Sequence, residues 1–131
     1  MRDVVIVDSV RTGLTKAFRG SFNLTRSDDM LAHCIDSLLD RNPNVGADEV
    51  EDVVVGAATH AGEQDGNIAR LAVVLSKLPI TAAGVSINRF CSSGLQAITI
   101  AANQIASGQT EVAIAGGVDS ISMRCLLYTS P

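Results

Sequence analysis

The chain has 131 residues, a formal net charge of −4 at pH 7 and a hydrophobic fraction of 47 %. That length fits one domain with one core, and the acidic balance with scattered Lys and Arg argues against nucleic-acid binding. No apolar run approaches the roughly 18 residues that a membrane-spanning helix requires.

The first half of the chain predicts a strand, a helix and a second strand. Residues 3–10, DVVIVDSV, form an apolar run without alternation, which is typical of a buried parallel strand. After a polar loop, Ser27 and the two acids that follow it favour a helix start. Apolar residues then recur at helical spacing until Asn42: Met30, Leu31, Cys34, Ile35, Leu38 and Leu39. Residues 50–58, VEDVVVGAA, predict the second strand.

The second half continues the same alternation. The predicted elements are, in order, a helix capped by Asn67 and running to about Lys77, a strand over 84–90, a helix over 91–107 with Gly108 as its C-terminal cap, and a strand over 111–118. The apolar stripe of the last helix is expected to contain Leu95, Ile98, Ala102 and Ile105.

Strands that alternate with helices indicate an α/β fold with a mostly parallel sheet and helices on both faces. Numbering the strands along the chain, we expect the spatial order 3-2-1-4, with right-handed crossovers. Residues 1–124 are expected to form one domain.

The last seven residues, 125–131 (CLLYTSP), fit no element of this pattern. They resemble the read-through translation of a sequencing adapter. We interpret them as a non-native tail, in which Cys125 and Tyr128 have no function. The alternative is a genuine C-terminal tail.

The three cysteines, Cys34, Cys91 and Cys125, have neither metal-ligand spacing nor a disulfide pattern, so we expect no metal site. Cys34 lies on an apolar helical stripe and is expected in the core. Cys91 follows a strand and begins a helix, where unpaired N–H groups and the helix dipole favour a thiolate. The same N–H groups can bind an oxyanion. The small residues Ser92, Ser93 and Gly94 leave room beside the sulfur.

Four segments together resemble the thiolases, the family of 3-ketoacyl-CoA thiolase and acetyl-CoA acetyltransferase. NRFCSSGLQAI (88–98) is similar to the segment around the family's nucleophile. The other segments follow in the family's order: VDSVRTG (7–13), GNIARLAVVLSKLP (66–79) and AIAGGVDSIS (113–122). The resemblance covers nearly all of residues 3–123 and implies that residues 1–124 are an incomplete N-terminal domain of this family.

The resemblance implies that Cys91 is the catalytic nucleophile, which takes an acyl group from a 3-ketoacyl-CoA and passes it to free CoA. Coenzyme A is then a substrate, and no further cofactor is expected. The family's later motifs, with a His, a second Cys and an Asn-His pair, match nothing here. This chain alone is therefore expected to be inactive. The parent protein is expected to be a cytoplasmic homodimer or homotetramer that does not enter a membrane.

Other polar residues have weaker interpretations. His33 is expected in solvent, and His60 follows a strand end, although the family places its base elsewhere. Asn88 and Arg89 either fix the local backbone or meet a second subunit across a two-fold axis; the resemblance favours the subunit contact and directs the loop 62–67 toward the partner's active site. Close backbone packing is expected at Gly116 and Gly117, and Asp119 and Glu111 are expected to be surface acids.

Three functions stay open. The first is a degradative 3-ketoacyl-CoA thiolase of fatty-acid β-oxidation, which Phe90 and the two serines after Cys91 favour. The second is a biosynthetic acetyl-CoA C-acetyltransferase. The third is a thiolase-like protein that binds acyl-CoA or lipid without catalysis. Ketoacyl synthases share the fold, but their nucleophile segment differs from this one.

Overall fold

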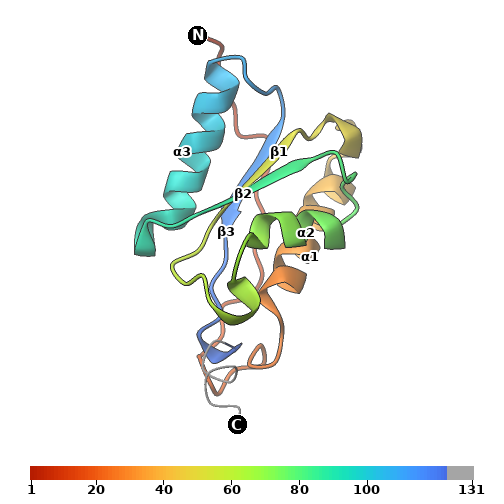
Figure 1. Cartoon of the computed structure of the whole chain (residues 1–131). Helices are drawn as coiled ribbons and strands as arrows, with labels where there is room; N and C mark the ends of the chain where they lie inside the picture. The colour runs from red at the N-terminus through yellow and green to blue at the C-terminus, as the bar shows by residue number, and fades with distance from the viewer. Residues whose placement is uncertain (124–131) are drawn as a thin grey trace.

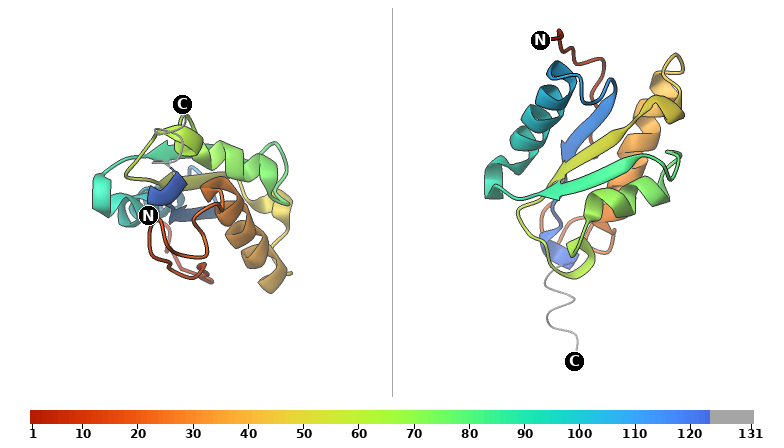
Figure 2. Two further views of the ribbon diagram at one scale, coloured as in Figure 1. Left: turned by 90° about the horizontal axis from the view of Figure 1, so that it is seen from below. Right: turned by 45° about the horizontal axis from the view of Figure 1, so that its top comes forward.

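The structure, a computed structural model that describes residues 1–123, has a parallel sheet between two layers of helices (Figures 1 and 2). The strands are β1 (Asp52–Gly56), β2 (Ala83–Ile87) and β3 (Ala113–Gly117). The helices are α1 (Ser27–Arg41), α2 (Ile68–Leu75) and α3 (Ser93–Ala106), with single 3-10 turns η1 (Ala47–Glu49), η2 (Gly62–Gln64) and η3 (Phe90–Ser92). The predicted α/β class is confirmed.

The central strand β1 is apolar because helices cover both of its faces. Val53 and Val55 pack in one cluster with residues of α1 and α2, such as Ile35 and Ile68. Val54 faces the other way and packs with Ala97 of α3. Helices therefore lie on both sides of the sheet, as expected from the sequence, and the hydrophobic core has two parts.

The first predicted strand is absent. Residues 3–10 have no strand assignment, and Val5, Ile6 and Val7 are each more than 70 % exposed. The segment is held near its ends: the Arg2 N–H donates to Ala106 O at 3.1 Å, and Asp8 accepts hydrogen bonds from Arg41 and Asn42. The strand prediction is therefore wrong: the apolar, β-branched run has the composition of a strand, but within residues 1–123 it pairs with neither of the free outer edges, those of β2 and β3.

The predicted strand order 3-2-1-4 is also wrong. The sheet order is β2-β1-β3, and both neighbours are parallel to β1. Asp52 to Gly56 pair with Ala83 to Ile87 on one side and with Ala113 to Gly117 on the other. A strand has only two edges, so both edges of β1 are occupied and the N-terminal segment cannot lie between β1 and β3.

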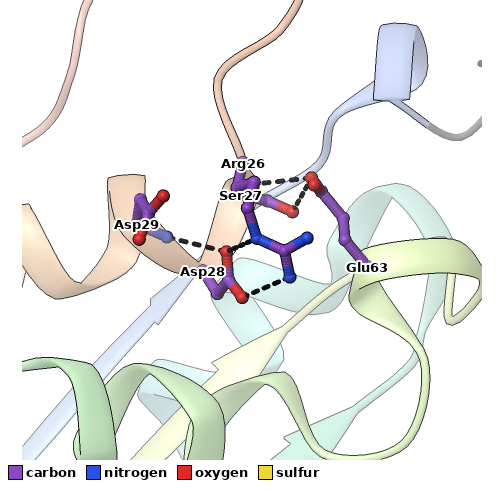
Figure 3. A network of polar contacts seen from close by, with 5 residues as sticks. All are labelled: Arg26, Ser27, Asp28, Asp29 and Glu63. Atoms are coloured by element: carbon purple, nitrogen blue, oxygen red, sulfur yellow. Dashed lines mark hydrogen bonds and ion pairs between the residues drawn. The ribbon is translucent and has the colours of Figure 1, made fainter.

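The start of α1 is fixed by a residue from a distant loop rather than by its own cap. Ser27, expected to be the N-cap, is the first helical residue and is fully buried. Glu63 of η2 accepts a hydrogen bond from the Ser27 N–H at 2.8 Å and another from its hydroxyl (Figure 3). Beside it, Arg26 forms a two-point ion pair with the buried Asp28. A carboxylate at this helix end is favourable because it faces the positive end of the dipole.

The expected stripe of α3 is not its buried face. Ser93, Ala97 and Ala101 are the buried residues, whereas Leu95 is 70 % exposed and Ile98 is 43 % exposed. Small residues on the sheet side let the helix approach β1 and β3 closely. The larger apolar side chains are left facing outward, which hydropathy alone did not distinguish.

Other helix boundaries agree with the sequence. Asn67 caps α2 by accepting a hydrogen bond from the Arg70 N–H at 3.0 Å, although the helix ends at Leu75 rather than near Lys77. Asn42 ends α1, as predicted. Gly108 has a φ of 80° directly after α3, a conformation that glycine adopts without steric cost.

Candidate active site

Cys91 lies in a sharp elbow between β2 and α3. The strand ends at Ile87, the 3-10 turn η3 spans Phe90–Ser92, and α3 begins at Ser93. The α-helix therefore starts two residues later than predicted, and Cys91 belongs to the tight turn that precedes it. Its side chain is exposed and it is not part of a disulfide. The elbow thus presents the thiol to solvent at the carboxyl end of the sheet.

The elbow is held by side chains on both sides of the cysteine. The Ser93 hydroxyl donates to Phe90 O at 2.6 Å and accepts from the Arg89 N–H at 2.8 Å. Asn88 Oδ1 accepts from the Phe90 N–H at 2.8 Å. These contacts support Phe90 in the left-handed region, with a φ of 48°, where a non-glycine residue costs roughly 1–2 kcal/mol.

Two glycines let the elbow sit directly on the sheet. A Cβ at Gly56 would lie 2.3 Å from the backbone carbon and oxygen of Ser93. A Cβ at Gly117 would lie 2.9 Å from Gly56 O and 3.4 Å from Gly94 Cα. Gly117 therefore has the close backbone packing expected of it, whereas at Gly116 an added Cβ would meet nothing within 4 Å. The strand ends and the start of α3 are in backbone contact.

Asn88 makes local contacts in this structure. Besides its bond to Phe90, its Nδ2 donates to Ala58 O at 3.2 Å, in the loop after β1. The amide therefore joins the elbow to the neighbouring strand end, which is the local-structure interpretation of this residue. The Arg89 backbone N–H takes part through Ser93.

Neither histidine has a hydrogen bond to the cysteine within residues 1–123. His60 Nε2 donates to the backbone oxygen of Ala57 at 2.9 Å, in the loop that follows β1. His33 is exposed on α1, as expected. The chemistry of the described site therefore consists of the Cys91 thiol and the backbone around it.

Sequence reasoning missed two residues at the carboxyl end of the sheet. Asp119, expected to be only a surface acid, is exposed but accepts hydrogen bonds from the N–H groups of Ala58 and Thr59 at 3.0 and 3.2 Å. Gln64 is 2 % exposed and donates to both Asp119 and the backbone oxygen of Thr59. No local pattern identifies these residues, because the bonds of Asp119, and those of Gln64 to Asp119 and Ser120, span 55 to 61 positions of the chain. Glu111, the other expected surface acid, forms an exposed ion pair with Arg2.

Cys34 occupies a different environment. It lines a cavity of about 630 Å³ between α1, the segment 10–17 and one face of β1 and β3. Burial raises the pKa of the Cys34 thiol, and a hydrogen bond from the Thr12 backbone partly opposes that shift. The cavity does not include Cys91. Cys34 is half-buried, which agrees with its expected place on the inner face of α1.

Residues 1–123 contain no group of three or more His, Cys, Asp or Glu side chains arranged to hold a metal ion. No helix among them has the length and hydropathy to span a bilayer.

Within residues 1–123, the fold and the elbow define an α/β domain that presents one exposed cysteine, Cys91, between β2 and α3. Comparison with known proteins identifies the family. The model of the thiolase N-terminal domain matches residues 4–130, so this chain belongs to the thiolase family.

Several curated relatives are thiolases. The chain is 46 % identical to the β-ketoadipyl-CoA thiolase of Pseudomonas putida over 93 % of its own length and 30 % of the relative's. It is 42 % identical to the 3-oxoadipyl-CoA/3-oxo-5,6-dehydrosuberyl-CoA thiolase of Escherichia coli over 93 % of this chain and 30 % of that protein. It is 41 % identical to the 3-ketoacyl-CoA thiolase of Aliivibrio salmonicida over 91 % of this chain and 31 % of that protein. The chain thus spans about a third of the length of these relatives.

The residues proposed as a non-native tail, 125–131, lie outside the described part of the chain.

Proposed function

We propose that this chain is the nucleophile-bearing part of a thiolase that transfers an acyl group through Cys91. The observation that carries the proposal is the exposed thiol in the β2–α3 elbow, held by Asn88 and Ser93 within the segment that resembles the family's nucleophile motif. Covalent catalysis through a thiolate divides a difficult carbon–carbon cleavage into two easier steps.

In the first step the Cys91 thiolate attacks the keto carbon of a 3-ketoacyl-CoA. The bond between that carbon and C2 of the substrate breaks, and its electron pair stays on C2, which takes a proton as acetyl-CoA leaves. In the second step the thiolate of free CoA attacks the acyl-Cys91 thioester, releases acyl-CoA and restores the Cys91 thiolate. Cys91 is the catalytic residue, and CoA is a substrate rather than a bound cofactor.

We assign the activity to a longer protein that contains this chain. The chain covers 30–31 % of the relatives compared above, and its described residues provide neither a base hydrogen-bonded to Cys91 nor a second cysteine beside it. Proton transfer at the substrate and at the nucleophile must come from elsewhere. On its own, the 131-residue chain is expected to show no turnover.

For the substrate, we propose the degradative direction with a 3-ketoacyl-CoA. The names of the relatives include both β-ketoadipyl-CoA and 3-ketoacyl-CoA thiolases, so both a dicarboxylic and a straight-chain substrate belong in the assay. A fatty-acid β-oxidation role predicts faster cleavage of the straight-chain substrate, and faster condensation of acetyl-CoA would favour the biosynthetic alternative.

The decisive experiment compares Cys91→Ser with Cys34→Ser in the longer protein. CoA-dependent cleavage of both ketoacyl-CoA substrates is followed spectrophotometrically, and the acyl-enzyme is trapped by acid and located by peptide mass spectrometry. Cys91→Ser is expected to abolish cleavage and the acyl adduct, whereas Cys34→Ser retains both. If the unaltered protein binds acyl-CoA but forms no adduct and no product, the non-catalytic alternative is correct.

We also propose that the parent protein is a homo-oligomer that pairs through β2. Within residues 1–123, β2 has a neighbour on one side only, and its Val85 is 37 % exposed. Phe90, Leu95 and Ile98, which follow β2 in the chain, also face outward. An open strand edge followed by exposed apolar side chains is suited to a second copy of itself, because a two-fold axis pairs the same edge with itself.

A further inference from the structure

One peptide group connects the end of β3 to the elbow that carries Cys91. In the peptide between Ala58 and Thr59, the carbonyl accepts from Asn88 Nδ2 at 3.2 Å, and the N–H donates to Asp119 at 3.2 Å. Asn88 in turn accepts the Phe90 N–H at 2.8 Å, one residue before the cysteine. The result is a continuous series of hydrogen bonds from Asp119, through a peptide of the β1 loop and Asn88, to the elbow.

The Asp119 end of this series is itself fixed. Asp119 also accepts from the Ala58 N–H at 3.0 Å and from Gln64 Nε2 at 3.1 Å. The buried Gln64 also contacts the loops that follow β1 and β3. Its amide donates to Thr59 O at 2.7 Å and accepts from the Ser120 N–H at 2.7 Å. Two side chains thus tie the loop after β1 to the loop after β3.

The elbow needs such support. Phe90 has a φ of 48°, and a residue in this region keeps its conformation only where its surroundings enforce it. Hydrogen bonds in series strengthen one another, and charge on the Asp119 carboxylate polarises the peptide toward Asn88.

We propose that Asp119 and Gln64 are positioning residues for Cys91, acting through the peptide between Ala58 and Thr59 and through Asn88. They do not touch the substrate. They hold the loop that Asn88 contacts, and Asn88 holds the turn that carries the thiol. The proposal rests on Cys91 being the nucleophile of the proposed function.

The test measures alkylation of Cys91 by iodoacetamide in the 131-residue chain, resolved by peptide mass spectrometry, so that no substrate is required. The variants are Asp119→Ala, the milder Asp119→Asn and Asn88→Asp. Asn88→Asp keeps an acceptor for the Phe90 N–H but removes the donor to Ala58. Asp65→Asn is the matched control, because Asp65 is an exposed acid of the same loop that accepts only from the adjacent Gly66 N–H.

Asp119→Ala and Asn88→Asp are each expected to slow Cys91 alkylation at pH 7.5 by about threefold, the effect of a lost hydrogen bond. Asp119→Asn should have a smaller effect in the same direction, and Asp65→Asn none. The double variant Asp119→Ala/Asn88→Asp should be no slower than the slower single variant, because both changes interrupt one series. The Cys34 rate in the same samples should not change, which separates positioning from general destabilisation.

Three outcomes would each overturn the proposal. The first is a double variant whose Cys91 rate falls by the product of the two single effects. The others are an unchanged Cys91 rate in Asp119→Asn and a Cys34 rate that changes in parallel with that of Cys91. In the longer protein, Asp119→Asn is expected to lower kcat for ketoacyl-CoA cleavage with less than a twofold change in KM. If Cys91→Ser leaves that cleavage intact, the proposed function fails, whatever the alkylation data show. If Cys91→Ser abolishes it but the Asp119 variants alkylate normally, only the positioning role fails.

Discussion

Cys34 and Cys91 lie in different environments, and the reactivity of each thiol can be measured separately. Cys91 is exposed in a tight turn, whereas Cys34 is half-buried and lines a cavity. Burial disfavours the charged form of a thiol and raises the pKa of Cys34. Because the thiolate is the form that reacts with alkylating agents, both burial and the raised pKa slow the reaction of Cys34.

We predict that iodoacetamide at pH 7 labels Cys91 well before Cys34. As the pH is raised toward 10, the Cys34 rate should increase over a higher pH range than that of an unperturbed thiol, because its raised pKa delays thiolate formation. Peptide mass spectrometry of timed samples gives both rates from one reaction. Faster labelling of Cys34 at pH 7 would contradict the burial described here.

For individual residues, the sequence allows predictions only where a local pattern surrounds the residue. The proposed role of Cys91 rests on the contiguous motif around it, and the half-buried position of Cys34 follows from the helical stripe on which it lies. Asp119 and Gln64 were missed because their partners, Thr59 and Ser120, come from loops that meet only when the strands align.

At the scale of elements, the first turn of α3 lies close to the sheet because Gly56, at the end of β1, has no side chain. Gly56→Ala would put a Cβ 2.3 Å from the Ser93 backbone, so the helix and the elbow must move away from the sheet. We expect the free energy of unfolding to fall by about 1–3 kcal/mol. Urea unfolding followed by far-UV circular dichroism suits the measurement, because the chain has no Trp.

Gly116→Ala is the matched control for this substitution. It adds the same methyl group in the same sheet, but at a position where a Cβ meets nothing within 4 Å. Its free energy of unfolding should be unchanged or raised by up to about 1 kcal/mol, because Gly in a strand interior is entropically costly. Equal losses in the two variants would contradict the close approach of α3 to β1.

The start of α1 offers a second test. Glu63→Ala would leave the buried N–H and hydroxyl of Ser27 without their acceptor, at a cost of about 1–3 kcal/mol. Glu63→Gln keeps an oxygen for Ser27 and replaces Oε2, which has no hydrogen-bond partner in the described structure. We therefore expect Glu63→Gln to be clearly more stable than Glu63→Ala in the same urea assay. Similar losses would mean that charge, rather than hydrogen bonding, anchors the helix.

The sequence predicted most helices and strands correctly, but it predicted less well which face of each element is buried. The period of Met30 to Leu39 located α1, and Asn67 located the start of α2. The buried face of α3 was misassigned because hydropathy favours Leu95 over Ala97, while close packing on a sheet selects the smaller residue.

For the whole molecule, the open edge of β2 predicts self-association of the longer protein. Val85→Lys places a charge on that edge, a substitution by which natural sheets prevent pairing. Sedimentation velocity is expected to show a smaller assembly for Val85→Lys than for the unaltered protein. Leu24→Lys, which changes an exposed apolar residue outside the sheet, should leave the assembly intact. An unchanged assembly in Val85→Lys would exclude pairing through β2.

The strand order could not be predicted from local patterns, because it depends on which distant segments of the chain pair with one another. The segments of β1, β2 and β3 can each be recognised by their apolar residues. So can the segment 3–10, which is not a strand in this structure. Pattern identifies a sequence able to form a strand, whereas contacts with the rest of the fold decide whether it joins the sheet and where.

The exposed N-terminal segment is expected to affect how the 131-residue chain behaves in concentrated solution. Val4 to Val7 are four consecutive β-branched residues that make no backbone hydrogen bonds within the described residues. Short stretches of this composition can stack between molecules into cross-β fibrils. Because stacking requires many molecules and folding requires one, dilution should favour the native form, and concentrated stocks should slowly acquire thioflavin-positive material.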